Sequence, residues 1–464
     1  MSSMEALMIG VSGMRGTIGG TLSPIVINQM ASAFATWLKE TQKPVNGAHF
    51  RLVLGRDSRP SGPWVCDAAT AAFAASGLEV IDLDVVTTPG VAMMVKHLQA
   101  DCGIVITASH NPVQWNGMKF LNSAGIALPP EAAEQIKSFY LEKKTSYVRV
   151  NYLFQPKRNT ETHALHIKRV LDYVDVLGVS AKRFKVVLDS VNGAGCVVTH
   201  TMLSKLGCQI SHLYNIPDGQ FPHEPEPTAA NLTELAAEVK RQKAVVGFAQ
   251  DPDADRLAIV DENGIYIGEE YSLVLAARYM LAKRPGAVCL NLSSSRMVDD
   301  VAAKYGGRVI RTCVGEANVV HAMLANDAVI GGEGNGGVID TRIVAGRDSM
   351  VGMAYILQLM TETGKTISEL VAEIPKYDIV KTKFDCRRED ANRAVEALKE
   401  AFAGGDAKVD TQDGIRIDWP TAWVHARPSN TEPVMRIIAE APDRATADQR
   451  IAQVQAVVDG VLKG

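Results

Sequence analysis

The sequence predicts an α/β protein made of several domains. Short apolar runs typical of strands alternate with segments of helical periodicity from the N-terminus to about residue 374, which is the pattern of α/β architecture. At 464 residues the chain is too long for a single hydrophobic core, and ordinary domain sizes suggest about three or four domains. From about Pro375 the alternation becomes less regular, which indicates a smaller domain of a different kind.

We place the first domain at residues 1–155. An alanine-rich segment at 63–75 has one apolar face and is expected to be a helix, and a polar stretch at 147–160 is typical of a linker. The strands expected around this helix lie at residues 52–55, 80–83 and 103–106.

The following sections repeat this scheme. We place the second domain at residues 156–262, the third at 263–374 and the fourth at 375–464. A turn at 193–195 leads into a helix, and a further helix is expected at 232–241. Strands are expected at residues 185–188, 209–213, 244–249, 257–260, 287–292, 308–314 and 328–331.

In each of the first three sections, the third core strand runs directly into an unusual polar loop. The three loops read TASHNP at 107–112, DPDADR at 251–256 and GEGNGG at 332–337. Sequence identity between the sections is negligible, so the repeat is one of architecture. Because open α/β sheets bind ligands at their strand ends, three such units facing one cleft would assemble a composite site.

The second of these loops is a candidate metal site. Asp251, Asp253 and Asp255 stand at alternate positions and are followed by Arg256. A hard divalent cation with oxygen ligands is the expected way to neutralise so compact a group of acids. An EF-hand calcium loop does not fit, because Arg256 stands where that loop needs glycine and because the flanking segments are typical of strands. A solvated acidic turn is the remaining alternative.

Ser109 is the candidate carrier of a phosphoryl group. It follows an apolar strand among small polar neighbours, and the acidic loop could supply the cation that such a group needs. His110 beside it is a further candidate catalytic residue, although adjacent residues of an extended loop do not meet in the geometry of a catalytic triad. A serine that caps a turn is the alternative.

Lys119 and Arg15 are candidates because of their surroundings. Lys119 follows the serine loop closely enough for a hairpin to fold it back beside that loop. The alternative is a lysine that is only a surface charge. Arg15 lies in a glycine-rich segment at 10–17, whose bare backbone amides could approach an anion. This segment matches neither the P-loop nor the dinucleotide-binding fingerprint.

Two further loops offer polar groups that suit a phosphorylated sugar. Glu333 and Asn335 present a carboxylate and an amide two residues apart, which suits paired sugar hydroxyls, with a tight turn as the alternative. The sequence RPSNTEP at 427–433 places a guanidinium, two hydroxyls and an amide in a loop that two prolines stiffen. Its candidate phosphate-binding residues are Arg427, Ser429, Asn430 and Thr431.

Composition and charge argue against nucleic acid or a membrane as a partner. A hydrophobic content of 47% and a net charge of -4 are typical of a globular protein that does not attract nucleic acid or an anionic membrane by bulk charge. No apolar run approaches the length of a membrane span. The seven cysteines are dispersed and the N-terminus lacks the features of a signal peptide, so we expect reduced thiols and a cytoplasmic location.

The four loops together resemble those of the α-D-phosphohexomutases, in which motifs of the forms TASHNP, DPDADR, GEGNGG and RPSNTEP occur in this order over essentially the whole chain. The resemblance implies four domains in a heart-shaped arrangement around a central cleft. Three of them would be similar mixed α/β sandwich domains, and the C-terminal one a smaller TBP-like α+β domain. The implied activity interconverts hexose 1-phosphates and 6-phosphates through a phosphoserine and a 1,6-bisphosphate. Mg2+ and a glucose 1,6-bisphosphate-type activator would be the cofactors, a phosphosugar the partner, and the protein a monomer or homodimer.

The resemblance also implies a role for each loop residue. Ser109 would be the phosphoserine and would bind Mg2+ together with the three aspartates, and Lys119 would be the general acid/base. Arg15 and Arg256 would contact phosphate or substrate near the metal. The residues implied to bind the sugar hydroxyls or the phosphate that is not reacting are Glu333, Asn335, Arg427, Ser429, Asn430 and Thr431.

One departure bears on the substrate. Many members of this family have Ser and His in the sugar loop, as in GEMSGH, where this chain has Asn335 and Gly337. In this form the loops look most similar to those of phosphoglucosamine mutases, with phosphomannomutases and phosphoglucomutases as alternatives. A serine-phosphoenzyme sugar phosphatase and a non-catalytic sugar-phosphate-binding protein are the alternatives from other classes.

Overall fold

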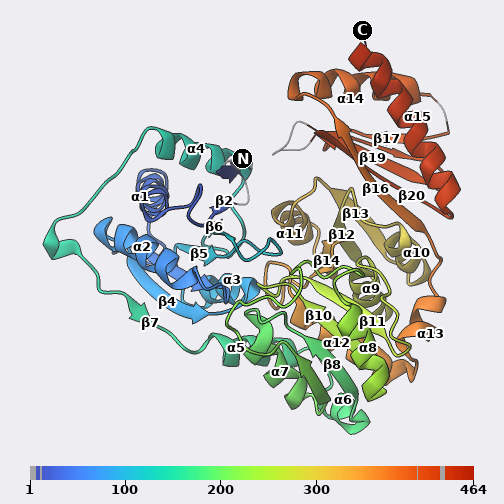
Figure 1. The fold of residues 1–464 in the computed structure, drawn as a ribbon, viewed down its shortest axis with the longest axis horizontal. Coiled ribbons are helices and arrows are strands. Elements are labelled where there is room, and N and C mark those ends of the chain that lie inside the picture. Colours follow the sequence, from blue (N-terminus) through green and yellow to red (C-terminus); the bar gives the residue numbers. More distant parts are fainter. Residues whose placement is uncertain (1–6, 11–12, 405, 429–433, 464) are drawn as a thin grey trace. The chain divides into compact units, whose positions relative to one another are not determined.

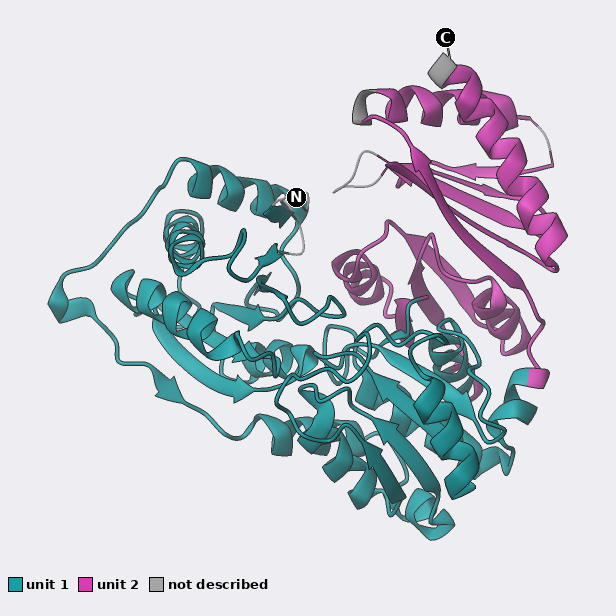
Figure 2. Ribbon diagram, in the orientation of Figure 1, with its two compact units in different colours: residues 1–280, 335–371 teal, residues 281–334, 372–464 magenta. Residues whose placement is uncertain are grey.

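The structure of the protein is a computed structural model that describes residues 7–10, 13–404, 406–428 and 434–463 (Figure 1). The chain divides into two compact units (Figure 2). Unit 1 comprises residues 1–280 and 335–371, and unit 2 comprises residues 281–334 and 372–464. None of the helices in the described part of the chain has a stretch that is both long and apolar enough to cross a membrane.

Unit 1 begins with a seven-stranded mixed sheet whose strand order is β1-β2-β6-β5-β3-β4-β7. β3 runs parallel to β4 and β5, whereas β6 returns antiparallel to β5 and then pairs with β2. The strands are β1 (Met8–Gly10), β2 (Gly13–Thr17), β3 (Arg51–Arg56), β4 (Glu79–Val85), β5 (Cys102–Ile106), β6 (Trp115–Leu121) and β7 (Lys157–Arg158).

Helices cover both faces of this first sheet. α1 starts where the Ser23 hydroxyl accepts a hydrogen bond from the Val26 amide at 3.3 Å, a common N-cap. The helices are α1 (Pro24–Thr41), α2 (Gly62–Ala75), α3 (Thr88–His97) and α4 (Pro130–Leu141), followed by a 3-10 turn at Val150–Tyr152. α1 packs against both α2 and α4, while α3 packs against β3 and β5.

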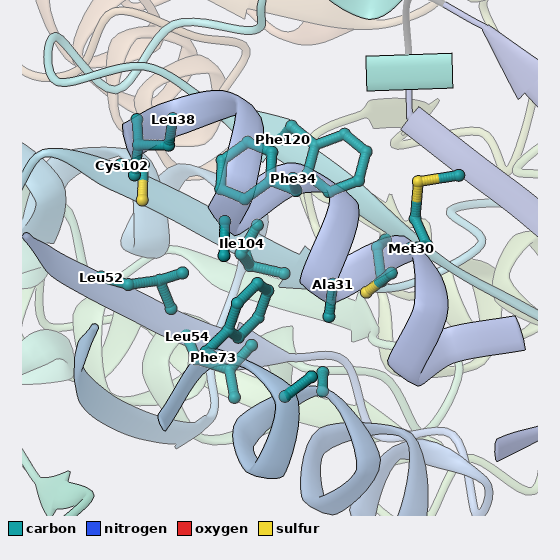
Figure 3. Close-up of a cluster of buried hydrophobic side chains, with 14 of the residues drawn as sticks. Met30, Ala31, Phe34, Leu38, Leu52, Leu54, Phe73, Cys102, Ile104 and Phe120 are labelled. Atoms are coloured by element: carbon teal, nitrogen blue, oxygen red, sulfur yellow. The ribbon is translucent and has the colours of Figure 1, made fainter. Parts of the chain in front are cut away.

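Aromatic side chains form the centre of the core between α1 and the sheet. Phe34 of α1 stacks on Phe120 of β6 with ring centroids 4.8 Å apart, and it meets Phe73 of α2 edge-on at 6.2 Å (Figure 3). Leu52 of β3 and Ile104 of β5 belong to the same cluster and are fully buried. Each such apolar side chain contributes about 1.5–3 kcal/mol through burial. This core holds the strand ends that carry the first polar loop.

The second sheet of unit 1 has the order β11-β10-β8-β9. β8 runs parallel to β9 and β10, and β11 returns antiparallel to β10. The strands are β8 (Lys185–Asp189), β9 (Gln209–Leu213), β10 (Val246–Gln250) and β11 (Leu257–Asp261), and the helices are α5 (Thr162–Leu171), α6 (Val176–Lys182), α7 (Gly195–Lys205) and α8 (Thr233–Gln242). Unit 1 also contains β15 (Gly337–Ile339), α12 (Ser349–Thr363) and most of α9 (Tyr271–Lys283) and α13 (Ile367–Ala372).

Unit 2 contains two kinds of sheet. In the first, β12 (Ala287–Asn291) runs parallel to β13 (Arg308–Thr312) and β14 (Ile330–Glu333), together with α10 (Met297–Lys304) and α11 (Glu316–Ala325). The second is antiparallel, in the order β16-β20-β19-β18-β17, and α14 and α15 pack on it. Its elements are β16 (Asp378–Asp385), β17 (Lys408–Asp410), β18 (Ile415–Asp418), β19 (Trp423–Pro428), β20 (Val434–Ala441), α14 (Arg388–Phe402) and α15 (Arg444–Lys463).

These elements confirm the predicted fold class of mixed α/β domains followed by an α+β domain with an antiparallel sheet. The strands expected at 52–55 and 185–188 are β3 and β8, and the helix expected at 63–75 is α2. The stretch at 147–160 is more than a linker, because its residues 157–158 form β7 and pair with β4.

Candidate active site

The acidic loop at 251–256 joins β10 to β11 and buries its three aspartates completely. Each of Asp251, Asp253 and Asp255 offers a carboxylate oxygen, and these oxygens all lie within 4.8 Å of one another. The loop folds around Asp251, whose Oδ1 accepts hydrogen bonds from the amides of Asp255 and Arg256, each at 3.1 Å. Ala254 adopts a left-handed backbone with φ +57°, which lets the chain turn between the acids.

Two cations and a hydroxyl hold this acid cluster. The Lys119 Nζ atom lies 2.6 Å from Asp253 Oδ2 and 3.6 Å from Asp255 Oδ2. Arg347 Nη2 lies 2.6 Å from Asp255 Oδ2, and the Thr88 hydroxyl donates to Asp253 Oδ2 at 2.6 Å. Burial by itself raises the pKa of a carboxyl group, but these neighbours more than offset it and lower the pKa of Asp253 and of Asp255.

The cluster fits a divalent cation. Oδ1 of Asp253 and Oδ1 of Asp255 are buried and have no hydrogen-bond partner among the residues that the structure describes. Burial, followed by the charges of Asp255 and Asp253, raises the pKa of Asp251. Three clustered carboxylates, with one oxygen of Asp253 and one of Asp255 left without a donor in the described part of the chain, suit an ion with oxygen ligands.

Ser109 lies against this cluster. Its Oγ donates a hydrogen bond to Asp251 Oδ2 at 3.1 Å, and its backbone has φ +53°. The Ser109 amide donates to the Thr107 hydroxyl at 2.8 Å. The structure therefore brings the serine loop and the acidic loop, which are far apart in the sequence, to one place in unit 1.

Arg59 is a residue of this site that the sequence analysis missed. Its side chain is fully buried, and its guanidinium donates to three backbone carbonyls of the serine loop, those of Ser109, Asn111 and Pro112, and to that of Trp115 at the start of β6, at 2.6 to 3.0 Å. Asp57 holds the guanidinium from behind, with Oδ2 3.0 Å from Arg59 Nε. The available signal was the charged sequence at 56–59, which begins at the last residue of β3 and so stands at a strand end, as the other polar loops do.

The other cationic candidates of unit 1 gather around the same cluster. Burial lowers the pKa of Lys119, but Asp253 and Asp255 outweigh it and raise that pKa, so the ammonium keeps its proton. Arg15 lies on β2 and is partly buried, and burial lowers its pKa although Asp253 and Asp255 act in the opposite direction. Arg256 Nη1 lies 3.5 Å from Glu226 Oε1.

His110 is a neutral neighbour of the serine. Burial, then the charges of Arg256 and Arg15, lowers the pKa of His110 to about 3. Its Nδ1 lies 3.4 Å from Ser109 Oγ and its Nε2 lies 4.0 Å from Glu226 Oε1. An imidazole that stays neutral can accept or donate a proton only weakly at neutral pH, so it adds polarity without charge beside the serine.

The predicted sugar-binding pair is divided between the two units. Glu333 ends β14 in unit 2, where its Oε1 accepts hydrogen bonds from Asn291 Nδ2 at 2.9 Å and from the Gly315 amide at 3.1 Å. Asn335 belongs to unit 1, and its Oδ1 is buried without a hydrogen-bond partner among the described residues. The carboxylate of Glu333 is thus held at the end of β14, whereas the amide oxygen of Asn335 lies in the turn between β14 and β15, unpartnered by any residue that the structure describes.

The predicted phosphate loop is only partly described. Arg427 lies on β19, and its Nη1 is 3.8 Å from Asp413 Oδ2. The neighbouring candidates Ser429, Asn430 and Thr431 lie outside the described residues.

Comparison with known proteins assigns each part of the chain to one family. Models of the phosphoglucomutase/phosphomannomutase family match α/β/α domain I at residues 6–147, domain II at 164–264, domain III at 269–377 and the C-terminal domain at 382–457.

Similar relatives and a similar structure agree with these matches. A phosphoglucomutase/phosphomannomutase of Thermococcus kodakarensis is 34% identical over 98% of this chain and 99% of its own. A probable phosphoglucosamine mutase of Methanopyrus kandleri is 35% identical over 94% of each chain. The crystal structure of a phosphoglucomutase/phosphomannomutase family protein from Burkholderia thailandensis superposes with a TM-score of 0.85 at 25% identity, covering 98% of this chain and 99% of its own. The protein therefore belongs to the phosphoglucomutase/phosphomannomutase family, that is, to the α-D-phosphohexomutases.

Proposed function

We propose that the protein is a phosphohexomutase that interconverts hexose 1-phosphate and hexose 6-phosphate through a phosphoserine at Ser109 and a sugar 1,6-bisphosphate. The single observation that carries this proposal is the 3.1 Å contact between Ser109 Oγ and Asp251 of the buried acid cluster. It pairs a hydroxyl able to carry phosphate with a site able to hold the cation that phosphoryl transfer requires. Membership of a family of mutases supports the same reaction class, an isomerase that works by phosphoryl transfer.

Asp251, Asp253 and Asp255 are proposed to hold Mg2+ together with an oxygen of the phosphoryl group on Ser109. When bound, this ion would neutralise charge on the transferred phosphoryl group. The cations around the cluster, Arg15 and Arg256, are proposed to bind the same group or the substrate, because guanidinium groups bind phosphate oxygens with paired hydrogen bonds.

The transfer step moves one proton as well as one phosphoryl group. The bond between phosphorus and Ser109 Oγ breaks, and a bond forms between phosphorus and a hydroxyl oxygen of the sugar. The hydroxyl loses its proton and Ser109 Oγ gains one. The neighbouring carboxylates keep Lys119 protonated. We propose that Lys119 donates a proton to the serine oxygen and takes up a proton from the sugar hydroxyl. The bisphosphate then turns around and returns its other phosphoryl group to Ser109.

The substrate must be held at both ends during this exchange. Glu333 and Asn335 are proposed to bind sugar hydroxyls, and Arg427, with Ser429, Asn430 and Thr431, to bind the phosphate that is not reacting. We propose glucosamine phosphate as the preferred substrate, supported by the loop GEGNGG and by relatives named phosphoglucosamine mutase. Mannose and glucose phosphates are the second candidates, because another relative is named phosphoglucomutase/phosphomannomutase.

A product assay tests this proposal. The 1-phosphates of glucosamine, mannose and glucose are incubated separately with the protein, Mg2+ and a small amount of the matching 1,6-bisphosphate, and the products are followed by phosphorus NMR. We expect the corresponding 6-phosphate, formed fastest from glucosamine 1-phosphate, and no inorganic phosphate. Release of inorganic phosphate and free sugar would instead identify a phosphatase and overturn the proposal.

A further inference from the structure

The space beside Gly337 in the sugar loop is filled by Arg347. A β-carbon added at Gly337 would lie 2.8 Å from Arg347 Cγ and still closer to Arg347 Cδ. The φ angle of Gly337 is not in the positive range, so the backbone does not require glycine at this position. The aliphatic part of the Arg347 side chain does require glycine at position 337, because any side chain there would have to displace it.

The end of that arginine reaches the acid cluster. Arg347 Nη2 lies 2.6 Å from Asp255 Oδ2, and the Arg347 side chain is only 12% exposed. Asp253 is held in the same way, since its Oδ2 accepts from Thr88 and Lys119 at 2.6 Å each. In both carboxylates the held oxygen is Oδ2, while Oδ1 is buried without a hydrogen-bond partner among the described residues.

The residues after Arg347 fix it to the same acidic loop. Asp348 caps α12 by accepting from the Met350 amide at 2.9 Å, and it pairs with buried His166 at 2.6 Å. The Ser349 hydroxyl donates to the Ala254 carbonyl, between Asp253 and Asp255, at 2.6 Å. Ser349, two residues after Arg347, is therefore hydrogen-bonded to the acidic loop through both its hydroxyl and its amide. This anchors the chain beside Asp255, the carboxylate that the Arg347 guanidinium contacts.

We propose that Arg347 is a positioning residue of the metal site, and that glycine at position 337 is the condition for it. The guanidinium holds Asp255 by one oxygen so that the other is directed to the cation, as groups that hydrogen-bond a metal ligand from outside commonly do. This inference rests on the cation site of the proposed function. The competing explanation is that Arg347 is only a counter-ion that neutralises Asp255 and competes with the metal.

The two explanations predict opposite signs when the guanidinium is removed. We would measure Mg2+ binding to the metal-free, full-length protein by calorimetry for Arg347→Met, which keeps most of the stem without the donors. We expect Mg2+ affinity to fall about tenfold, as for other losses of an outer hydrogen-bond partner. The Mg2+ affinity of Arg347→Lys should be intermediate, because lysine keeps the positive charge but lacks the planar, two-pronged donor group of arginine. Unchanged or tighter binding in Arg347→Met would overturn the proposal.

A matched control removes an arginine that has no part in the site. Arg284 is half exposed and pairs with exposed Asp327 at 2.9 Å, so Arg284→Met deletes the same charge elsewhere. Its Mg2+ affinity should equal that of the wild type. A tenfold loss in Arg284→Met as well would mean that net charge, not position, controls binding, and would contradict the proposal.

A double-mutant cycle tests the link between the two positions. Gly337→Ala should displace Arg347 and weaken Mg2+ binding about as much as Arg347→Ala does, and the double variant should bind no more weakly than Arg347→Ala alone. Losses that multiply, or a Gly337→Ala variant that binds like the wild type, would refute the link. If wild-type protein binds Mg2+ and isomerises sugar phosphates while Arg347→Met matches it, only the role of Arg347 fails. If the wild type does neither, the proposed function fails.

Discussion

Ser109 is kept in a backbone conformation that non-glycine residues seldom adopt. A left-handed residue of this kind costs about 1 kcal/mol or more, so its surroundings must hold it. Arg59 does this by donating to the carbonyl of Ser109 and to three further carbonyls within residues 111–115. The backbone is thereby fixed, and the Ser109 hydroxyl is left to face Asp251.

We predict that Arg59→Met impairs both stability and turnover. The change leaves Asp57 buried without its cation, and breaking a buried ion pair on one side costs about 3–5 kcal/mol. It also releases the four carbonyls that the guanidinium binds, so turnover should fall at least tenfold at temperatures where the variant is folded. Thermal unfolding and the mutase assay measure the two effects.

Arg59→Lys separates the two effects of this variant. Lysine retains the charge beside Asp57 but offers one compact donor group in place of the planar guanidinium. We expect it to recover part of the stability and little of the turnover. Turnover at the wild-type level in Arg59→Lys would show that turnover does not depend on a guanidinium that binds all four carbonyls.

At the residue scale, the sequence marked the groups that carry charge or a nucleophile but not those that hold them. Ser109 and the three aspartates stand out because they follow apolar strands in unusual polar loops. The role of Arg59 depends on carbonyls of residues about 50 positions further along the chain, and no local pattern encodes such contacts. The same holds for Arg347, whose partner Asp255 is 92 positions away.

At the element scale, polar contacts connect the edge of the second sheet to the acidic loop. His212 of β9 lies with Nε2 2.9 Å from Ser190 Oγ, and Ser190 contacts Gln250, the last residue of β10, at 3.4 Å. Gln250 in turn donates to the Ser349 hydroxyl at 2.7 Å. Burial, then the neighbouring His200, lowers the pKa of His212 to about 4, so the ring is neutral in the folded protein at neutral pH.

We predict that His212 makes the stability of the protein fall in mild acid. Its folded pKa of about 4 lies below the ordinary value of 6.5, so its contribution is complete above pH 6.5 and is lost as the pH falls towards 4. Between pH 7 and pH 5 the wild type should lose roughly 1–2 kcal/mol of unfolding free energy that a His212→Gln variant retains. Urea unfolding at the two pH values measures this difference. Equal losses in both proteins would contradict it.

The strands were predictable because their apolar runs are short and separated by turn residues. The run at 244–249 became β10, and the run at 257–260 became β11. What the runs did not reveal was direction, since β10 and β11 are both short apolar runs but β11 is antiparallel to its neighbour. The strand β6, which contains Asn116 and Lys119, was not among the expected strands. The pairing of β7 with β4 was also missed, because a strand of two exposed, charged residues has no apolar pattern.

At the scale of the whole molecule, the alternation of strands and helices predicted the order of fold types correctly, with mixed α/β domains followed by an α+β domain. The four domain boundaries stay predictions. The first unit contains mixed sheets, and the second contains the parallel pairs of β12 with β13 and β14 as well as an antiparallel sheet. The heart-shaped arrangement around a central cleft stays a prediction, as do the oligomeric state and the cytoplasmic location.

Ser109 is proposed to receive a phosphoryl group and pass it on, and one measurement follows that group directly. The full-length protein is incubated with Mg2+ and glucose 1,6-bisphosphate carrying radioactive phosphorus, separated from free label, and then mixed with unlabelled glucosamine 6-phosphate. We predict that label first appears on Ser109 and then moves to sugar phosphates, with none released as inorganic phosphate. Ser109→Ala should take up no label while remaining folded, because it removes a single hydrogen bond to a charged group, which costs about 1.5–3 kcal/mol. Label recovered as inorganic phosphate, or mutase turnover that persists in Ser109→Ala, would contradict the account.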